Sequence, residues 1–148
     1  RDYYSSQLYH CDGDDVTQVK IFVYCTDVEP ASGPLTVLDA EATATVMRHA
    51  GYTFDSRLTD EQINNLVGAE RATPIMGPRG TTAFVDTSRC LHFGSRVAAD
   101  SQPRVVAMIQ YQTPWSFMPD DRVTPFRHLA HDRLPPLQRL VLGADARA

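Results

Sequence analysis

The sequence predicts an all-β core with a helical insert. Short segments rich in β-branched and aromatic residues are separated by Gly/Pro turns, and two helix-like segments lie between the second strand segment and the third. Strands at this spacing favour an antiparallel sandwich or barrel over alternating βαβ units. The 148 residues are enough for one domain with its own core, so we treat 1–148 as a single domain.

The first and longest strand segment is VTQVKIFVYCTDV, residues 16–28. Apolar side chains alternate onto both of its faces, as expected of a central strand that is buried on both sides. They are Val19, Ile21, Val23 and Cys25 on one face, and Phe22 and Tyr24 on the other. The turn EPASGP ends this strand, and LTVL, residues 35–38, is predicted as the second strand.

Two helices are predicted next. Asp39 is the predicted N-cap of AEATATVMRHA, because a short acidic side chain can accept hydrogen bonds from the first free amides of a helix. Gly51 is predicted to end this helix, because glycine readily adopts the left-handed conformation that follows a helix. In TDEQINNLVG, Thr59 is the N-cap, acids fill the first turn and Gly68 ends the helix.

The β pattern returns after GPRG. Three strands are predicted: TTAFV at 81–85, CLHF at 90–93 and RVVAMIQYQ at 104–112. The tail is expected to turn at Pro114, Pro119 and Pro125, and to form a short helix near 136–142.

Charge and composition exclude several classes of partner. The net charge is −4 with a pI near 5.6, which argues against binding nucleic acid or an anionic membrane by bulk charge. The longest apolar run, 105–109, is far too short to span a membrane. Three cysteines without close spacing indicate neither a disulfide framework nor a structural zinc site, so we expect a cytoplasmic protein. The start at Arg1 rather than Met suggests a fragment or a processed chain that lacks upstream elements.

The segment LYHCDGDD raises the question of a metal site. On a strand, His10 and Asp12 point to the same face and can converge on one ion, whereas Cys11 points the other way. The alternative is an acidic loop that happens to contain a histidine. A calcium loop does not fit, because Val16 and Val23 occupy positions where oxygen ligands are needed.

A third ligand and an anchor occur further along the chain. His92 lies in an apolar segment, where a hydrogen-bonded core histidine is the alternative. Arg104 opens the most apolar strand, where it is either an exposed strand end or an inward guanidinium that awaits a carboxylate. The order of His10, Asp12 and His92 is that of a facial triad of two histidines and one carboxylate.

These segments carry a family resemblance. YHCD, FVYCTDVEPASGPLTVL, FVDTSRCLHFGSR and PRVVAMIQY resemble the phytanoyl-CoA dioxygenase-like family of Fe(II)/2-oxoglutarate-dependent oxygenases over residues 7–111. The resemblance implies a double-stranded β-helix, or cupin-like jelly roll. It also implies that His10, Asp12 and His92 bind Fe(II), and that Arg104 pairs with the remote carboxylate of 2-oxoglutarate. The chain departs from the family where DAEATA follows the second strand, and the loop SRVAADSQP leaves Arg96 as a weaker candidate anchor.

The activity implied is hydroxylation of a small organic substrate by O2, with release of succinate and CO2. The carboxylate of Asp12 favours hydroxylation or desaturation over halogenation, in which related enzymes carry a small residue at this position. Two other hypotheses remain open: a catalytically inactive cupin-type metal-binding module, and a β-sandwich interaction domain in which the His/Asp/His order is coincidence.

Other chemically capable residues are assigned lesser roles. Lys20 is expected to reach solvent, although it could assist a carboxylate if its strand face is inward. Cys90 shares a face with His92, with a small buried thiol as the alternative. His128 and His131 are expected on a solvated turn, and residues 47–62 form a candidate lid.

Overall fold

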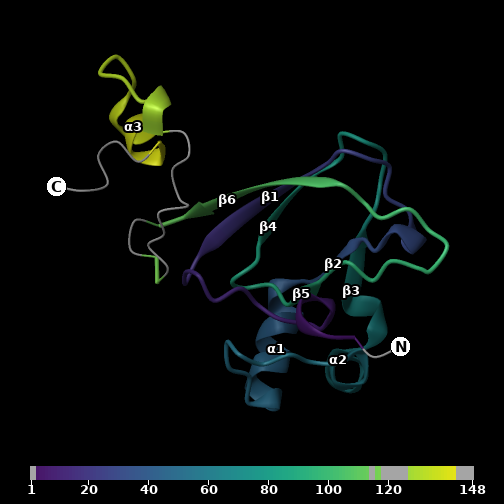
Figure 1. Ribbon diagram of the computed structural model, residues 1–148. Coiled ribbons are helices and arrows are strands. Elements are labelled where there is room, and N and C mark those ends of the chain that lie inside the picture. The colour runs from purple at the N-terminus through teal and green to yellow at the C-terminus, as the bar shows by residue number, and fades with distance from the viewer. Residues whose placement is uncertain (1–2, 114–115, 118–126, 143–148) are drawn as a thin grey trace.

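Two small antiparallel sheets face each other in the computed structural model, which describes residues 3–113, 116–117 and 127–142 (Figure 1). The first sheet has the order β4 (Thr82–Asp86), β1 (Gln18–Tyr24) and β6 (Val106–Gln112), and the second has the order β3 (Ala72–Ile75), β2 (Leu35–Leu38) and β5 (His92–Phe93). β1 and β2 are therefore the central strands, and both join segments that are distant in the sequence.

The space between the sheets is filled by an apolar cluster. Phe22 of β1, Leu35 of β2 and Val85 of β4 are buried there, and side chains of β3 and β6 pack against them. The odd-numbered residues of β2 face this cluster, whereas Leu38 faces the opposite side, so β2 is buried on both faces. This packing fixes the inner face of β1, on which Gln18, Lys20, Phe22 and Tyr24 alternate with outward residues.

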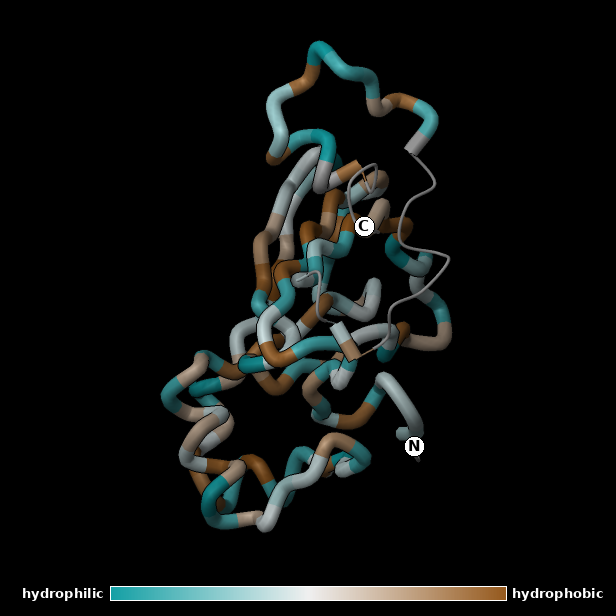
Figure 2. The backbone as a smooth tube through the Cα atoms, turned by 90° about the vertical axis from the view of Figure 1, so that its left-hand side faces the viewer, coloured by the Kyte–Doolittle hydropathy of each residue, from teal (hydrophilic) through white to brown (hydrophobic). Residues whose placement is uncertain are grey.

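The helices α1 (Ala40–Ala50) and α2 (Asp60–Val67) cover the outer side of the second sheet (Figure 1). A second apolar cluster lies between these helices and β2, and it includes the sequence neighbours of His10 and His92. Its buried members are Tyr9, Cys11, Leu38, Ala42, Val46, Leu58, Ile63 and Leu91. Hydrophobic and hydrophilic residues alternate along much of the chain (Figure 2).

The predicted helices are confirmed to the residue. Asp39 accepts a hydrogen bond from the Ala42 amide, and Gly51 ends α1 in the left-handed conformation at φ 59°. Thr59 caps α2 through the Gln62 amide, and Gly68 follows its last residue. The short C-terminal helix is α3 (Pro136–Val141).

The predicted strands are present: β2 has the predicted bounds, β4 is displaced by one residue, and β1, β5 and β6 are shorter than predicted. β3 was not predicted, because ATPI is short and contains a proline, which can lie in an edge strand such as β3. The expected turns at Pro114, Pro119 and Pro125 lie outside the described residues. None of the helices in the described part of the chain has the length and apolar character that crossing a membrane requires.

The prediction that β1 is buried on both faces is wrong. Its outer face, with the neighbouring residues of β4 and β6, is exposed: Val19 is 36% exposed, Phe84 70% and Ile109 49%. Apolar alternation identified β1 correctly as the central strand of its sheet, but nothing in the described residues covers this side.

Candidate metal centre

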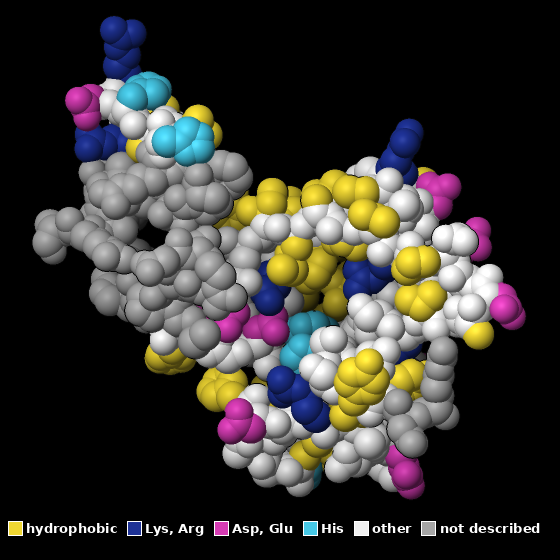
Figure 3. Space-filling model, in the orientation of Figure 1, with side chains coloured by type: hydrophobic (Ala, Val, Ile, Leu, Met, Phe, Trp, Pro, Cys, Tyr) yellow, Lys and Arg dark blue, Asp and Glu magenta, His cyan; other side chains and the backbone are white. Residues whose placement is uncertain are grey.

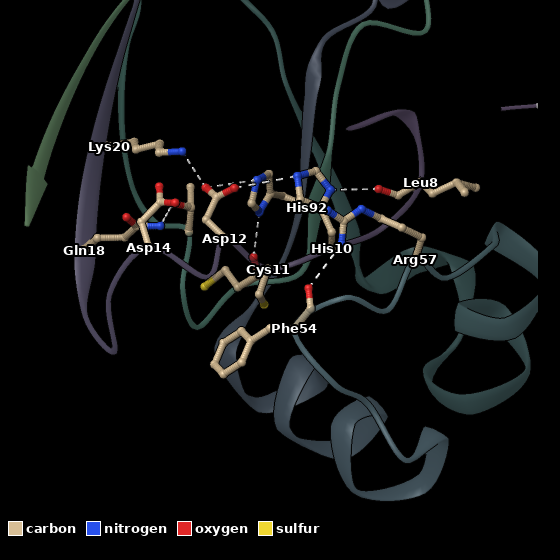
Figure 4. A network of polar contacts seen from close by, with 12 residues as sticks. Leu8, His10, Cys11, Asp12, Asp14, Gln18, Lys20, Phe54, Arg57 and His92 are labelled. Atoms are coloured by element: carbon tan, nitrogen blue, oxygen red, sulfur yellow. Dashed lines mark hydrogen bonds and ion pairs between the residues drawn. The ribbon is translucent and has the colours of Figure 1, made fainter. Parts of the chain in front are cut away.

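His10 and His92 are adjacent across an antiparallel backbone pair. The His10 amide donates to the His92 carbonyl at 3.0 Å, and the His92 amide donates back at 2.9 Å. The chain then places Asp12 beside them, because its amide donates to the Thr87 carbonyl at 2.9 Å. Two segments 80 residues apart are thus held together by main-chain hydrogen bonds at the point where the three side chains meet (Figure 4).

The hydrogen bonds of the two imidazoles determine their tautomers. His10 Nδ1 lies 2.9 Å from the Leu8 carbonyl oxygen, and His92 Nδ1 lies 2.9 Å from the Cys90 carbonyl oxygen. A carbonyl can only accept, so both Nδ1 atoms carry the proton. In a neutral ring of this tautomer Nε2 has the lone pair, which is the form in which histidine binds a metal.

Both Nε2 atoms face the Asp12 carboxylate. His10 Nε2 is 3.7 Å from Oδ1, and His92 Nε2 is 3.7 Å from Oδ2. These separations are too long for hydrogen bonds. They suit donors that share an ion, since ligands with bonds of about 2.1 Å lie roughly 3–4 Å apart. One ligand atom from each residue lies within 4.8 Å of the others, so the three form a group that can hold a metal ion.

Asp12 is held as a carboxylate. Burial alone would raise its pKa, but the nearby His92, Lys20 and Thr87 side chains together lower it below the ordinary value. The Lys20 ammonium donates to Oδ2 at 2.6 Å, and the Lys20 side chain is 11% exposed. The site therefore carries an anionic oxygen donor before any cation binds.

His92 is held neutral. It is 6% exposed, and burial is the main reason that its pKa falls from 6.5 to about 4. A neutral imidazole keeps the Nε2 lone pair available at neutral pH, which agrees with the tautomer set by its other nitrogen.

The two cysteines beside the ligands are not donors to this group. Cys11 is 1% exposed and packs into the helical cluster, on the side away from Asp12, as predicted. Burial raises the pKa of its thiol to about 12, and Cys11 is not part of the metal-capable group among the described residues. Cys90 is a free, half-buried thiol packed against the cluster between the sheets, with a pKa that burial also raises.

Arg104 lies beside the strand that carries His92. Its Nε donates to the Gly33 carbonyl at 2.6 Å, and a Cβ added to Gly94 would lie 2.6 Å from its Nη2. No carboxylate of the described residues lies within 4.0 Å of its guanidinium, and burial is the main cause of a pKa below its ordinary value. A guanidinium without a counter-anion in a half-buried position is suited to bind one.

Arg96, the weaker candidate anchor, is already paired. Its two terminal nitrogens donate to both oxygens of Asp60 at 2.8 and 2.9 Å, and Nε donates to the Gln7 carbonyl at 2.7 Å. Its guanidinium also lies 3.4 Å from the centroid of the Phe93 ring. Arg96 thus ties the N-terminal segment to α2 and β5.

The expectation that Lys20 reaches solvent is wrong. Lys20 shares the inner face of β1 with Phe22 and Tyr24, and that face is the buried one, so the side chain turns toward Asp12. The alternation of β1 groups Lys20 with Phe22 and Tyr24 but does not show by itself which face is inward. The space-filling view shows a hollow between the two sheets, with histidine at its base and basic side chains on its walls (Figure 3).

Several contributors to the site were not predicted. Thr87 and the Leu8 and Cys90 carbonyls have no motif of their own, and Gly94 matters only because of its distance from Arg104. His131 is exposed, and its Nδ1 accepts from the Arg133 amide; neither it nor His128 belongs to a metal-capable group among the described residues. Residues 47–62 pack against the ligand segment, since Tyr9 and Leu58 exchange hydrogen bonds and the Cys11 amide donates to the Tyr52 hydroxyl.

Comparison with known proteins gives no relative: neither a protein-family model nor a curated protein matches the chain.

Proposed function

We propose that this chain is a non-haem Fe(II)/2-oxoglutarate-dependent dioxygenase of the phytanoyl-CoA dioxygenase-like kind, with a double-stranded β-helix fold, that hydroxylates a small organic substrate. The observation that carries the proposal is the pair of imidazoles whose Nδ1 atoms bond to backbone carbonyls and whose Nε2 atoms face one carboxylate. Two histidines and one carboxylate on one side of an ion leave its other positions open, which is the ligand set of oxygen-activating non-haem iron enzymes.

A second observation supports the binding of 2-oxoglutarate as cosubstrate. Arg104 presents a guanidinium with no carboxylate partner in the described residues, next to the segment that carries His92. A planar fork of two parallel donors fits the distal carboxylate of 2-oxoglutarate. Arg96 is not available for this role, because its two terminal nitrogens already donate to the Asp60 carboxylate.

The chemistry belongs to the bound groups: Fe(II) and 2-oxoglutarate together reduce O2, so that one oxygen atom enters the substrate as a hydroxyl and the other enters succinate, with loss of CO2. The chain supplies the rest. His10, Asp12 and His92 hold the metal, Arg104 orients the cosubstrate, and the apolar cluster of Phe22, Leu35 and Val85 limits access of water from one side.

The test is metal binding followed by turnover. Anaerobically purified protein should bind one Fe(II), and in air it should convert 2-oxoglutarate to equimolar succinate and CO2 in the presence of a substrate. A slower, uncoupled succinate release without substrate is an adequate first readout. If the protein bound no Fe(II), the proposed function would be disproved.

A cupin-type metal-binding module without turnover is the second candidate. The group of His10, Asp12 and His92 that can hold a metal ion supports it, because this group requires no cosubstrate. The two functions separate on succinate: both bind metal, but only the oxygenase consumes 2-oxoglutarate. An interaction domain with a coincidental triad would bind no metal at all.

A further inference from the structure

Lys20 is the single lysine of the chain; the other 13 basic residues among the 14 are arginines. It is 9% exposed, on the inner face of the central strand β1, and its ammonium lies 2.6 Å from Asp12 Oδ2. Figure 4 shows it on the side of Asp12 away from the two histidines. Lys20 is not itself a metal ligand, because an ammonium has no lone pair to donate.

The strands around Lys20 offer it no other charged partner. In the register of the sheet it lies opposite Val85 of β4 and Gln110 of β6. Gln110 donates instead to Asp14 and to Gln18. An ammonium has three protons to donate, and only one of them is used by a described residue. Two donors therefore remain beside the candidate metal position.

The charges of the site have a direct consequence. A divalent ion held by two neutral histidines and Asp12 has a net charge of +1, and Lys20 raises this to +2 in a poorly hydrated place. Like charges at such short range repel strongly when water is excluded. The ammonium also competes with the ion for Oδ2. Lys20 thus opposes binding of the metal alone, and an anion that joins the metal relieves the repulsion.

We propose that Lys20 couples metal binding to the binding of an anionic co-ligand: it weakens the affinity of the triad for a bare divalent ion and strengthens it when a dicarboxylate binds beside the ion. This inference rests on the proposed metal site and extends it with a regulatory property. Its consequence is that the protein retains its metal chiefly in the presence of the organic acid, and by linkage holds the acid chiefly in the presence of the metal.

The experiment measures four affinities. Mn²⁺ binding is titrated with and without saturating 2-oxoglutarate, for the wild type and for Lys20→Met, which keeps the apolar stem and removes the charge. Lys20→Met should bind Mn²⁺ alone at least about tenfold more tightly than the wild type, and the factor by which 2-oxoglutarate tightens Mn²⁺ binding should fall at least about tenfold. Lys20→Arg, which keeps the charge, should retain most of the coupling.

A purely structural lysine gives the opposite result. If Lys20 only held Asp12 in place, Lys20→Met would bind Mn²⁺ alone more weakly or unchanged, and either outcome overturns the proposal. An unchanged coupling factor overturns it as well. Circular dichroism melting of each variant establishes that folded protein is compared.

The wild type provides a test that needs no variant. Because Lys20 is the single lysine, protein labelled with lysine that carries ¹³C only at Cε has one lysine side-chain signal. This signal should move when diamagnetic Zn²⁺ is added and move again with 2-oxoglutarate. No change at the second step overturns the proposal.

The same measurements separate a failure of the oxygenase function from a failure of the role proposed for Lys20. If the wild type binds Mn²⁺ but not 2-oxoglutarate, the oxygenase proposal fails, while the effect of Lys20→Met on Mn²⁺ alone, and on Mn²⁺ with oxalate as a small dianion, still decides the role of Lys20. If the wild type binds no metal, both fail together.

Discussion

His10 and His92 exchange both of their backbone hydrogen bonds, and their imidazole centroids lie 4.5 Å apart. The main chain therefore sets the distance between the two nitrogen donors, and the bonds from Nδ1 to the Leu8 and Cys90 carbonyls set the ring orientation. Because both constraints are independent of any ion, the site is organised before the metal arrives, which lowers the entropic cost of binding.

His92→Ala should abolish stoichiometric metal binding. It removes one of three donors, and a loss of at least about a hundredfold in affinity is expected, since even indirect partners of a metal ligand are worth ten- to a hundredfold. The measurement is Fe(II) content after anaerobic loading and desalting. His49→Ala is the matched control, because His49 is exposed on α1 and its Nδ1 bonds to the Thr45 carbonyl of the same helix. Unchanged iron in His92→Ala would disprove the triad.

Asp12→Ala should abolish hydroxylation, because it removes the anionic donor of the triad. Asp12→Glu should be nearly as inactive, since the longer side chain displaces the oxygen from a position that the Thr87 main chain and Lys20 fix. Succinate release with 2-oxoglutarate and Fe(II) is the readout. Full turnover by Asp12→Ala would show that the carboxylate is not a ligand.

Asp12 and Lys20 should also be coupled in the stability of the metal-free protein. Asp12→Ala leaves the Lys20 ammonium buried without its partner, and we expect a loss of about 3 kcal/mol, at the low end for a buried pair because the Asp12 side chain is 17% exposed. The double variant Asp12→Ala/Lys20→Met should recover most of this loss. Urea unfolding of the four proteins gives the interaction energy, and strict additivity of the two changes would contradict it.

Local signals in the sequence predicted the local structure well. Asp39 and Gly51 bound α1, and Thr59 and Gly68 bound α2, because capping depends on a few neighbouring residues. The alternation of side chains along an extended segment is equally local. It correctly predicted that His10 and Asp12 lie on one face and Cys11 on the other.

Long-range relationships were harder to predict. Lys20 was expected in solvent because its inward direction depends on which face of β1 meets the second sheet, a property of the assembled sheets. The outer face of β1 has the same apolar character as the inner one, so alternation alone could not show that it is exposed. β3 was missed because its pairing partner, β2, lies more than thirty residues earlier.

Arg104→Ala should lower the affinity for 2-oxoglutarate at least tenfold and leave metal binding intact, because losing one partner of a buried charge pair costs on the order of 2–5 kcal/mol. Arg104→Lys should recover little, since a point charge does not reproduce the fork. Arg96→Ala is the control: it should lower the melting temperature, because it breaks the Asp60 and Gln7 contacts, and leave the affinity of the folded protein unchanged. The opposite pattern would make Arg96 the anchor.

Gly94→Ala should weaken 2-oxoglutarate binding although it replaces neither a metal ligand nor the anchor. A Cβ at this position would lie 2.6 Å from Arg104 Nη2, so the guanidinium must move. The backbone of Gly94 does not have the positive φ that would itself exclude alanine, and the obstructing atom is the end of a flexible side chain. The cost in stability should therefore be small.

The displaced Arg104 gives this substitution its diagnostic value. Affinity for 2-oxoglutarate, measured anaerobically with Fe(II) bound, should fall several-fold, because a charged fork loses strength when its alignment is lost. In an Arg104→Ala background the same Gly94→Ala change should have no further effect, because the group it displaces is absent. If Gly94→Ala weakened binding equally in both backgrounds, the residue would act on the His92 strand and not through Arg104. If Gly94→Ala had no effect in either background, 2-oxoglutarate binding would not require the Arg104 guanidinium to lie beside Gly94.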